Sequence, residues 1–113
     1  MHESEFCMVY VTAPSREEAR RIADSLVEER YAACVNILGG IESCYWWEGS
    51  VQHEEEVALV AKTTSQGVDP LMKRVTELHS HECPCIVTIP LSRLHEPFAR
   101  WLDDQMSPVV PGK

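Results

Sequence analysis

Residues 6–27 read FCMVYVTAPSREEARRIADSLV, and this stretch places a strand pattern directly before a helix pattern. Residues 6–12 are apolar and β-rich on both alternating faces, which is typical of a central strand covered on both sides. Ser15 stands three residues before Glu18, the spacing of a capping box at a helix start. The apolar residues that follow share one helical face: Ala19, Ile22, Ala23, Leu26 and Val27. The stretch therefore predicts a buried strand followed by an amphipathic helix.

A long hairpin is expected after this helix. β-rich residues extend over 34–47 and return over 57–64, with turn-forming residues between the two runs. Gly39-Gly40 interrupts the first run, and two glycines inside a strand pattern indicate a bulge more often than a break. We expect the acidic run Glu54-Glu55-Glu56 to cover the solvent-exposed end of the hairpin.

A second helix, a fourth strand and a final helix complete the pattern. Asp69 is the expected N-cap of the second helix, with Pro70 at its first position. Residues 86–89 predict the fourth strand, which we expect Pro90 to end. The last helix is predicted over 96–106, and four of its residues are expected to face inward: Phe98, Trp101, Leu102 and Met106.

The element order strand–helix–strand–strand–helix–strand, with one further helix, predicts an α+β domain of the ferredoxin-like βαββαβ type. A chain of 113 residues suits a single domain, residues 1–113, with an ordered core at about 5–106 and a frayed tail. The sheet face opposite the helices has no cover unless the last helix or another subunit supplies it. Unpaired hairpin edges also favour association, so we expect an oligomer.

Composition restricts the classes of partner. A net charge of −8, from 10 basic and 18 acidic residues, weighs against a nucleic-acid partner, because phosphate binding requires Lys and Arg. Apolar runs fall short of the roughly 18 residues that a spanning helix needs, so no membrane crossing is expected. An odd number of cysteines, five, and an acidic start unlike a signal peptide predict reduced thiols and a cytoplasmic location. Three of the cysteines are interpreted as small packing residues: Cys7, Cys34 and Cys44.

The densest group of potential ligands occupies residues 79–85. His79, His81, Cys83 and Cys85 recur at every second position, so in an extended chain they would share one face. Neighbours two apart can chelate one ion, but the four together would span about 20 Å and need a bend, or ligands from elsewhere, to close a tetrahedral site. Imidazole and thiolate suit copper(I) or zinc better than magnesium or calcium. The alternative is a turn histidine with packing cysteines.

Two other features support weaker hypotheses. Three adjacent aromatic residues, Tyr45-Trp46-Trp47, cannot all enter the core from one strand, so at least one is expected to be exposed or to meet a partner. Cross-strand packing near the turn is the alternative. Lys62 is a lone cation in an apolar strand, where it could hold an anion or pair with Glu48 or Glu82. The alternative is a lysine that extends to solvent from a strand end.

In combination, these motifs resemble the CutA family of divalent-cation tolerance proteins over about residues 7–106. The resemblance rests on several motifs in order: Val11-Thr12-Ala13-Pro14, residues 26–37 (LVEERYAACVNI), residues 43–49 (SCYWWEG), residues 56–63, residues 79–84 (HSHECP) and Trp101-Leu102. It implies a tight homotrimer with sheet edges paired between subunits. It also implies a role in tolerance of divalent metals, copper above all, with no established catalytic activity. Similarity of the family to the trimeric PII signalling proteins implies small-molecule sensing as an alternative.

The resemblance also implies where a site lies. The family's polar cluster near subunit boundaries falls on five residues: Trp47, Glu48, Lys62, His79 and Glu82. Family members commonly read His-Pro-Tyr-Glu where this chain has residues 79–82 as HSHE, and a cysteine that some carry before the first-strand threonine is Val11 here. The implied copper role therefore transfers only to His79, and His81, Cys83 and Cys85 either form a substitute site or are incidental.

Together with this resemblance, the sequence predicts a non-catalytic metal-binding protein, with copper as its first ion and zinc as its second, and the resemblance implies that it is a homotrimer. Its predicted metal ligands are His79, His81, Cys83 and Cys85. The alternative is a PII-like sensor that binds a small anionic ligand in clefts between subunits, with four contact residues: Trp47, Glu48, Lys62 and Glu82. Catalysis is not expected. A cysteine nucleophile needs an adjacent base, and the sequence offers a single local pair of that kind, Cys83 near His81.

Overall fold

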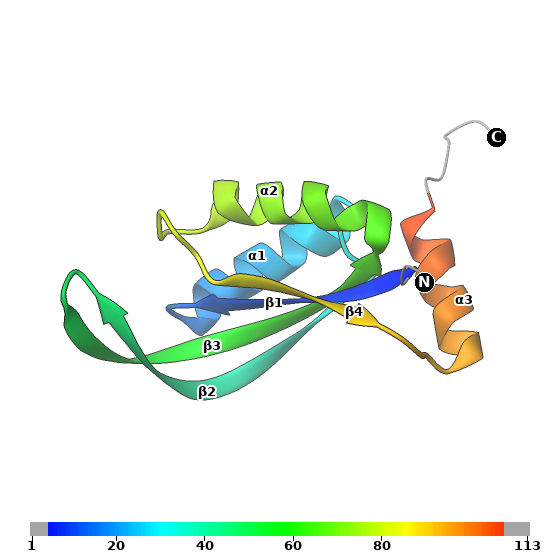
Figure 1. Cartoon of the computed structure of the whole chain (residues 1–113). Helices are drawn as coiled ribbons and strands as arrows, with labels where there is room; N and C mark the ends of the chain where they lie inside the picture. Colours follow the sequence, from blue (N-terminus) through cyan, green and yellow to red (C-terminus); the bar gives the residue numbers. More distant parts are fainter. Residues whose placement is uncertain (1–4, 108–113) are drawn as a thin grey trace.

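A computed structural model of the chain describes residues 5–107, which form one antiparallel sheet with two helices packed on one face and a third helix at one end of the sheet (Figure 1). The elements in chain order are β1 (Phe6–Ala13), α1 (Arg16–Glu28), β2 (Cys34–Trp47), β3 (Ser50–Thr64), a short 3-10 turn (Ser65–Gly67), α2 (Val68–Leu78), β4 (Ile86–Leu91) and α3 (Glu96–Met106). The strand order is β2-β3-β1-β4, and all three pairings are antiparallel. This arrangement confirms the predicted α+β class and element order.

The core lies between the sheet and the helices α1 and α2. Val9 and Val11 of β1 are fully buried, and their neighbours on β3 share the same face. From the helices, Ile22, Leu26 and Leu71 fill the space against these strands. Burial of such side chains contributes about 1.5–3 kcal/mol each, so this layer fixes α1 and α2 against the sheet.

The long hairpin of β2 and β3 extends beyond the body of the domain, at the end opposite α3 (Figure 1). Beyond Ala13, where β1 ends, the outer part of β3 has no β1 partner and pairs with β2 alone. The register shifts between Leu38 and Ile41, which confirms the bulge predicted at Gly39-Gly40. Glu48 and Gly49 both have positive φ, 49° and 81°, as a type I′ hairpin turn requires.

Several local expectations are wrong in detail. Asp69 is not the N-cap of α2, because the preceding 3-10 turn extends the helix start and leaves Gly67 at that position. Pro90 does not end β4, which reaches Leu91; β4 is an edge strand, where the missing proline N–H is tolerated. Trp101 does not face inward and is 41% exposed, although Leu102 is fully buried. The tail that was predicted to fray continues past residue 107, where the described residues end.

The sheet face opposite α1 and α2 carries apolar residues in contact with solvent. Val87 and Ile89 of β4 pair with Tyr10 and Met8, so they point away from the helix-covered side. Val87 is 50% exposed and Ile89 is 40% exposed. Within residues 5–107, no helix combines the length and the apolar character needed to span a membrane. An open apolar face of this kind is typical of a surface that associates with another protein.

Candidate functional site

The segment from residue 79 to residue 85 connects α2 to β4, and its first residue is fixed inside the domain. The His79 side chain is fully buried, and its Nε2 lies 2.8 Å from the Thr12 carbonyl oxygen. Its Nδ1 accepts a hydrogen bond from the backbone N–H of His81 at 3.0 Å. A carbonyl can only accept and a backbone N–H can only donate, so the proton resides on Nε2. Both ring nitrogens of His79 are therefore occupied within the protein.

Glu18 of α1 provides a second anchor for the same segment. Its Oε2 accepts hydrogen bonds from the backbone N–H and the hydroxyl of Ser80, both at 2.9 Å. Burial raises the pKa of the Glu18 carboxyl, but the two hydrogen bonds from Ser80 stabilise the anion, and the net effect is a lowered pKa. Ser15 caps α1 as predicted, accepting from the Glu18 N–H at 3.1 Å. The Glu18 carboxylate binds Ser80, however, so it ties two distant parts of the chain together.

A pocket of about 490 Å³ lies between the outer hairpin and the second half of this segment. Its lining comes from β1, β2, β3 and residues 81–85: Thr12, Tyr45, Trp47, Gln52, Glu54, Glu56, His81, Glu82, Cys83, Pro84 and Cys85. It brings together five of the predicted site residues: Trp47, Glu82, His81, Cys83 and Cys85. His79, Glu48 and Lys62 do not line it. The predicted residues thus divide into a pocket group and a group elsewhere.

Glu56 is the least expected member of the pocket. It is only 8% exposed, so the expectation that the acidic run covers the solvent-exposed end of the hairpin is wrong for Glu56. Glu54 and Glu55 are exposed, as expected. Among residues 5–107, no hydrogen bond or ion pair reaches its carboxylate. Its carboxylate oxygens still reach solvent, because no fully buried side-chain oxygen of the described residues lacks a hydrogen-bond partner. Since Glu56 lines the pocket, its carboxylate is available to a cation bound there.

The hairpin contributes further acidic character. Glu54 accepts a hydrogen bond of 2.5 Å from the Tyr45 hydroxyl. This bond, with help from the negative charges of Glu54 and Glu56, raises the pKa of Tyr45 to about 12. Glu54, Glu56 and Glu82 give the pocket three carboxylates, and its lining includes no Lys or Arg. The described residues contain no ready-made convergence of three His, Cys, Asp or Glu side chains on one metal position, so a bound ion would require side-chain rotation.

The remaining predicted site residues lie elsewhere. Lys62 is on β3, where its ammonium group donates to the Asn36 side-chain oxygen on the neighbouring strand. Glu48 occupies the exposed turn of the hairpin. Trp46 and Trp47 are 73% and 52% exposed, which confirms that the aromatic run cannot be wholly buried.

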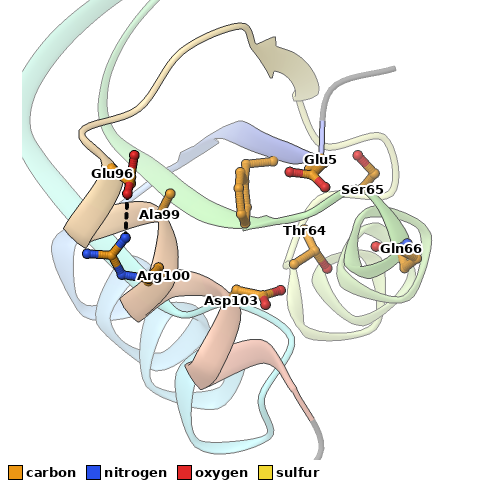
Figure 2. A pocket seen from close by; sticks show the side chains of 9 residues that line it. Glu5, Thr64, Ser65, Gln66, Glu96, Ala99, Arg100 and Asp103 are labelled. Carbon is orange, nitrogen blue, oxygen red and sulfur yellow. Dashed lines mark hydrogen bonds and ion pairs between the residues drawn. The ribbon is translucent and has the colours of Figure 1, made fainter. Parts of the chain in front are cut away.

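A separate pocket of about 440 Å³ lies between α3 and the start of β1 (Figure 2). Arg100 forms an ion pair with Glu96 at 2.7 Å there, and Glu5 and Asp103 also line it. The pair is exposed and joins residues four apart on one helix, where such pairs contribute about 0.3–0.5 kcal/mol. The residues predicted to carry function are absent from this pocket.

The fold and the pocket together define a ferredoxin-like α+β protein whose candidate site joins a long hairpin to the segment before β4. Residues 7–105 match the family model of the CutA1 divalent ion tolerance protein, and the chain belongs to this family. The resemblance seen in the sequence is thereby confirmed.

Individual relatives agree with this assignment. The divalent-cation tolerance protein CutA of Archaeoglobus fulgidus is 44% identical over 96 residues, covering 85% of this chain and 93% of that protein. Protein CutA, chloroplastic, of Arabidopsis thaliana is 41% identical over 95 residues, which cover 84% of this chain and 52% of the plant protein. The chain therefore spans about half the length of the plant relative and nearly all of the archaeal one.

Solved structures agree equally well. A structure described as the periplasmic divalent cation tolerance protein CutA from Archaeoglobus fulgidus has a TM-score of 0.88 at 41% identity, over 90% of this chain and 99% of that one. The divalent cation tolerance protein Cut A1 from Thermus thermophilus has a TM-score of 0.87 at 41% identity with the same coverage. These similarities confirm the fold.

Proposed function

We propose that this chain is a non-catalytic, metal-responsive protein that binds a soft cation in the pocket between the hairpin and residues 81–85. Copper is the first ion proposed and zinc the second. The observation that supports this most directly is the pocket itself, which brings His81, Cys83 and Cys85 together with the carboxylate of Glu56. Thiolate and imidazole ligands favour copper(I) and zinc over magnesium and calcium.

The charge of the pocket supports a cation as the ligand. Three carboxylates, Glu54, Glu56 and Glu82, line it and create a negative local field. The alternative of an anionic ligand near Lys62 lacks comparable support, because that ammonium group already binds Asn36 and lies outside the pocket. These carboxylates attract a cation and repel an anion.

The proposed ligands are His81, Cys83 and Cys85, with Glu56 available as an oxygen ligand. His79 has a different role in this proposal, because a metal could take its Nδ1 only by displacing the His81 N–H. We propose that His79 positions the segment so that the three residues after it face the pocket. Metal binding would release thiol protons, so affinity would rise with pH.

We also propose that three copies of the chain associate, as the family resemblance implies. The exposed apolar face around Val87 and Ile89 supports association. So does the outer part of β3, whose second edge has no strand beside it in one chain. Val87→Asp is expected to convert the oligomer to monomers in light scattering, whereas Arg20→Asp on the exposed face of α1 should leave its mass unchanged.

A cytoplasmic location is proposed as well. All five cysteines are free thiols in the structure, and reduced thiols suit a reducing compartment. Related proteins carry other addresses in their names, chloroplastic for the Arabidopsis protein and periplasmic for an Archaeoglobus structure. Fractionation of expressing cells, with thiol labelling of the recovered protein, tests the location; recovery in an oxidising compartment with disulfides would contradict it.

The decisive experiment is a titration of reduced, full-length protein with copper(I) and with zinc in competition with a chelator. We expect the variant His81→Ala/Cys83→Ser/Cys85→Ser to lose one metal equivalent per chain. The matched control, His95→Ala/Cys34→Ser, removes the same residue types outside the pocket and is expected to bind like the wild type. Light scattering on all three proteins checks that assembly is unchanged. Equal binding by wild type and pocket variant would show that the segment is structural.

A further inference from the structure

A second group of potential ligands lies on the other face of the hairpin. Cys44 of β2 and His53 of β3 are direct cross-strand partners, and the Cys44 Sγ lies 3.9 Å from the His53 Nε2. Both side chains are exposed, so the interpretation of Cys44 as a packing residue is wrong. Side chains alternate between faces along a strand, so this pair points away from Tyr45 and Glu54, which belong to the pocket already described.

The next pair on the same face is Glu42 opposite Glu55. Two carboxylates directly opposite each other on a sheet repel and destabilise the pairing. In the part of the chain that the structure describes, neither carboxylate takes part in an ion pair. These four residues, together with Ser43 and Glu54, line a hollow of about 340 Å³. A bound cation would remove the repulsion.

We propose that Cys44, His53, Glu42 and Glu55 form a surface site for a zinc-class divalent ion. Zinc binds sulfur at about 2.3 Å and nitrogen at about 2.0–2.1 Å, and a tetrahedral angle between them separates the two ligand atoms by roughly 3.6 Å. The observed 3.9 Å between the sulfur of Cys44 and the ring nitrogen of His53 is close to that value. Half of the coordination sphere is therefore nearly in place before an ion arrives.

The carboxylates complete the site only after they rotate. No three such groups converge on one point among residues 5–107, so Glu42 and Glu55 must swing toward the Cys44–His53 pair when the ion binds. Both are exposed and free to do so at little cost. One thiolate, one imidazole and two carboxylates are all established zinc ligands, whereas magnesium and calcium prefer oxygen alone. The site goes beyond the proposed function, because none of these four residues belongs to the residue 81–85 segment.

The test uses full-length protein carrying His81→Ala/Cys83→Ser/Cys85→Ser, so that the pocket cannot contribute. Zinc is titrated against a chromophoric chelator, and cobalt(II) replaces zinc as a spectroscopic probe of thiolate coordination. We expect this background to retain one zinc per chain. Adding either Cys44→Ser or His53→Ala is expected to weaken zinc binding at least tenfold, and Cys44→Ser to remove the cobalt–thiolate absorption. Cys34→Ser, added to the same background, is the matched control and should leave both signals intact.

A measurement without substitutions checks the same site. In the reduced wild type, zinc is expected to slow alkylation of Cys44 at least tenfold, read by peptide mass spectrometry. The proposal is overturned if the pocket variant binds no zinc, if either hairpin substitution leaves zinc binding unchanged, or if zinc gives Cys44 no protection. The proposed metal binding in the pocket is tested separately, in a Cys44→Ser/His53→Ala protein whose pocket is intact. If that protein binds no copper or zinc, the proposed function fails while the hairpin site is judged by its own results.

Discussion

His79 and His81 are two residues apart in one segment, yet the structure places them in opposite situations. His79 is fully buried with both ring nitrogens hydrogen-bonded, to Thr12 and to the backbone of His81. His81 is exposed and lines the pocket with Cys83 and Cys85. The first half of the segment is therefore a fixed support and the second half is available to a ligand. A regular spacing of His and Cys residues indicates which side chains could bind a metal ion, and burial decides which of them are accessible to one.

The largest expected effect tests the support. His79→Ala removes the partner of the Thr12 carbonyl and of the His81 N–H and leaves a void, so we expect the free energy of unfolding to fall by about 3 kcal/mol. His81→Ala is exposed and is expected to change it by no more than about 0.5 kcal/mol. Urea denaturation of both variants measures the difference. Equal losses would mean that the two histidines are structurally alike.

The next effect distinguishes the positioning role of His79 from the proposed metal-binding role of Cys83 and Cys85. Saturating metal at about 100 times Kd stabilises the folded state by about 2.7 kcal/mol. In a Cys44→Ser/His53→Ala background, which removes the proposed hairpin site, we expect Cys83→Ser/Cys85→Ser to lose this increment. His79→Gln, which lowers the starting stability, is expected to keep it, because His79 is not proposed as a ligand. Thermal denaturation with and without copper(I) or zinc gives both values. If His79→Gln lost the metal-dependent stabilisation at a metal concentration that saturates the wild type, His79 would have to be counted as a ligand.

A smaller effect concerns the anchor from α1. Glu18→Gln weakens the two hydrogen bonds from Ser80, and we expect a loss of about 1–2 kcal/mol at pH 7. Because the folded pKa of Glu18 is lowered, its ionised form stabilises the fold above the unfolded pKa of about 4.3. That stabilisation is lost as pH falls through the folded pKa.

The difference in unfolding free energy between wild type and Glu18→Gln is therefore expected to shrink as the buffer is taken from pH 7 toward pH 3. Denaturant titrations across this range measure it. Glu17→Gln is the matched control, since Glu17 is exposed on the same turn of α1. A difference that stays constant through this range would show that the charge of Glu18 is not what stabilises the contact.

The element order and the core were predictable because they depend on local periodicity. The face of α1 with Ile22 and Leu26, and the apolar run of β1, are each contained in a few consecutive residues. The pocket was harder to predict from the sequence, because its lining depends on the register between β2 and β3. A bulge between Leu38 and Ile41 adds one residue to β2, and a shift by one residue exchanges the faces of every side chain beyond it. The sequence therefore could not show which glutamates of the hairpin share a face with Tyr45.

Contacts between residues far apart in the chain account for the other features that could not be predicted from the sequence. Glu18 carries a strong local signal, the capping-box spacing, which concealed that its carboxylate binds Ser80, 62 positions along the chain. Cys44 and His53 have no signal of their own in the sequence, because their proximity follows from the hairpin register. The candidate ligands at residues 81–85 were predictable as residue types. Glu56 was not, since its burial depends on how β3 passes the end of β1.

The smallest expected effect tests the two faces of the hairpin directly. The hydrogen bond to Glu54 is the main reason that the pKa of Tyr45 is raised to about 12. We expect Glu54→Gln to return it toward the ordinary value of about 10, because the amide removes the negative charge that disfavours the phenolate. Ultraviolet absorption titration, with Tyr45→Phe to identify the signal, measures the shift. Glu55→Gln is the matched control, because Glu55 is the next residue along β3 and points to the opposite face. If Glu55→Gln lowered the pKa of Tyr45 as much as Glu54→Gln does, the two faces would not be electrostatically distinct, and the division of the hairpin into a pocket side and a Cys44–His53 side would fail.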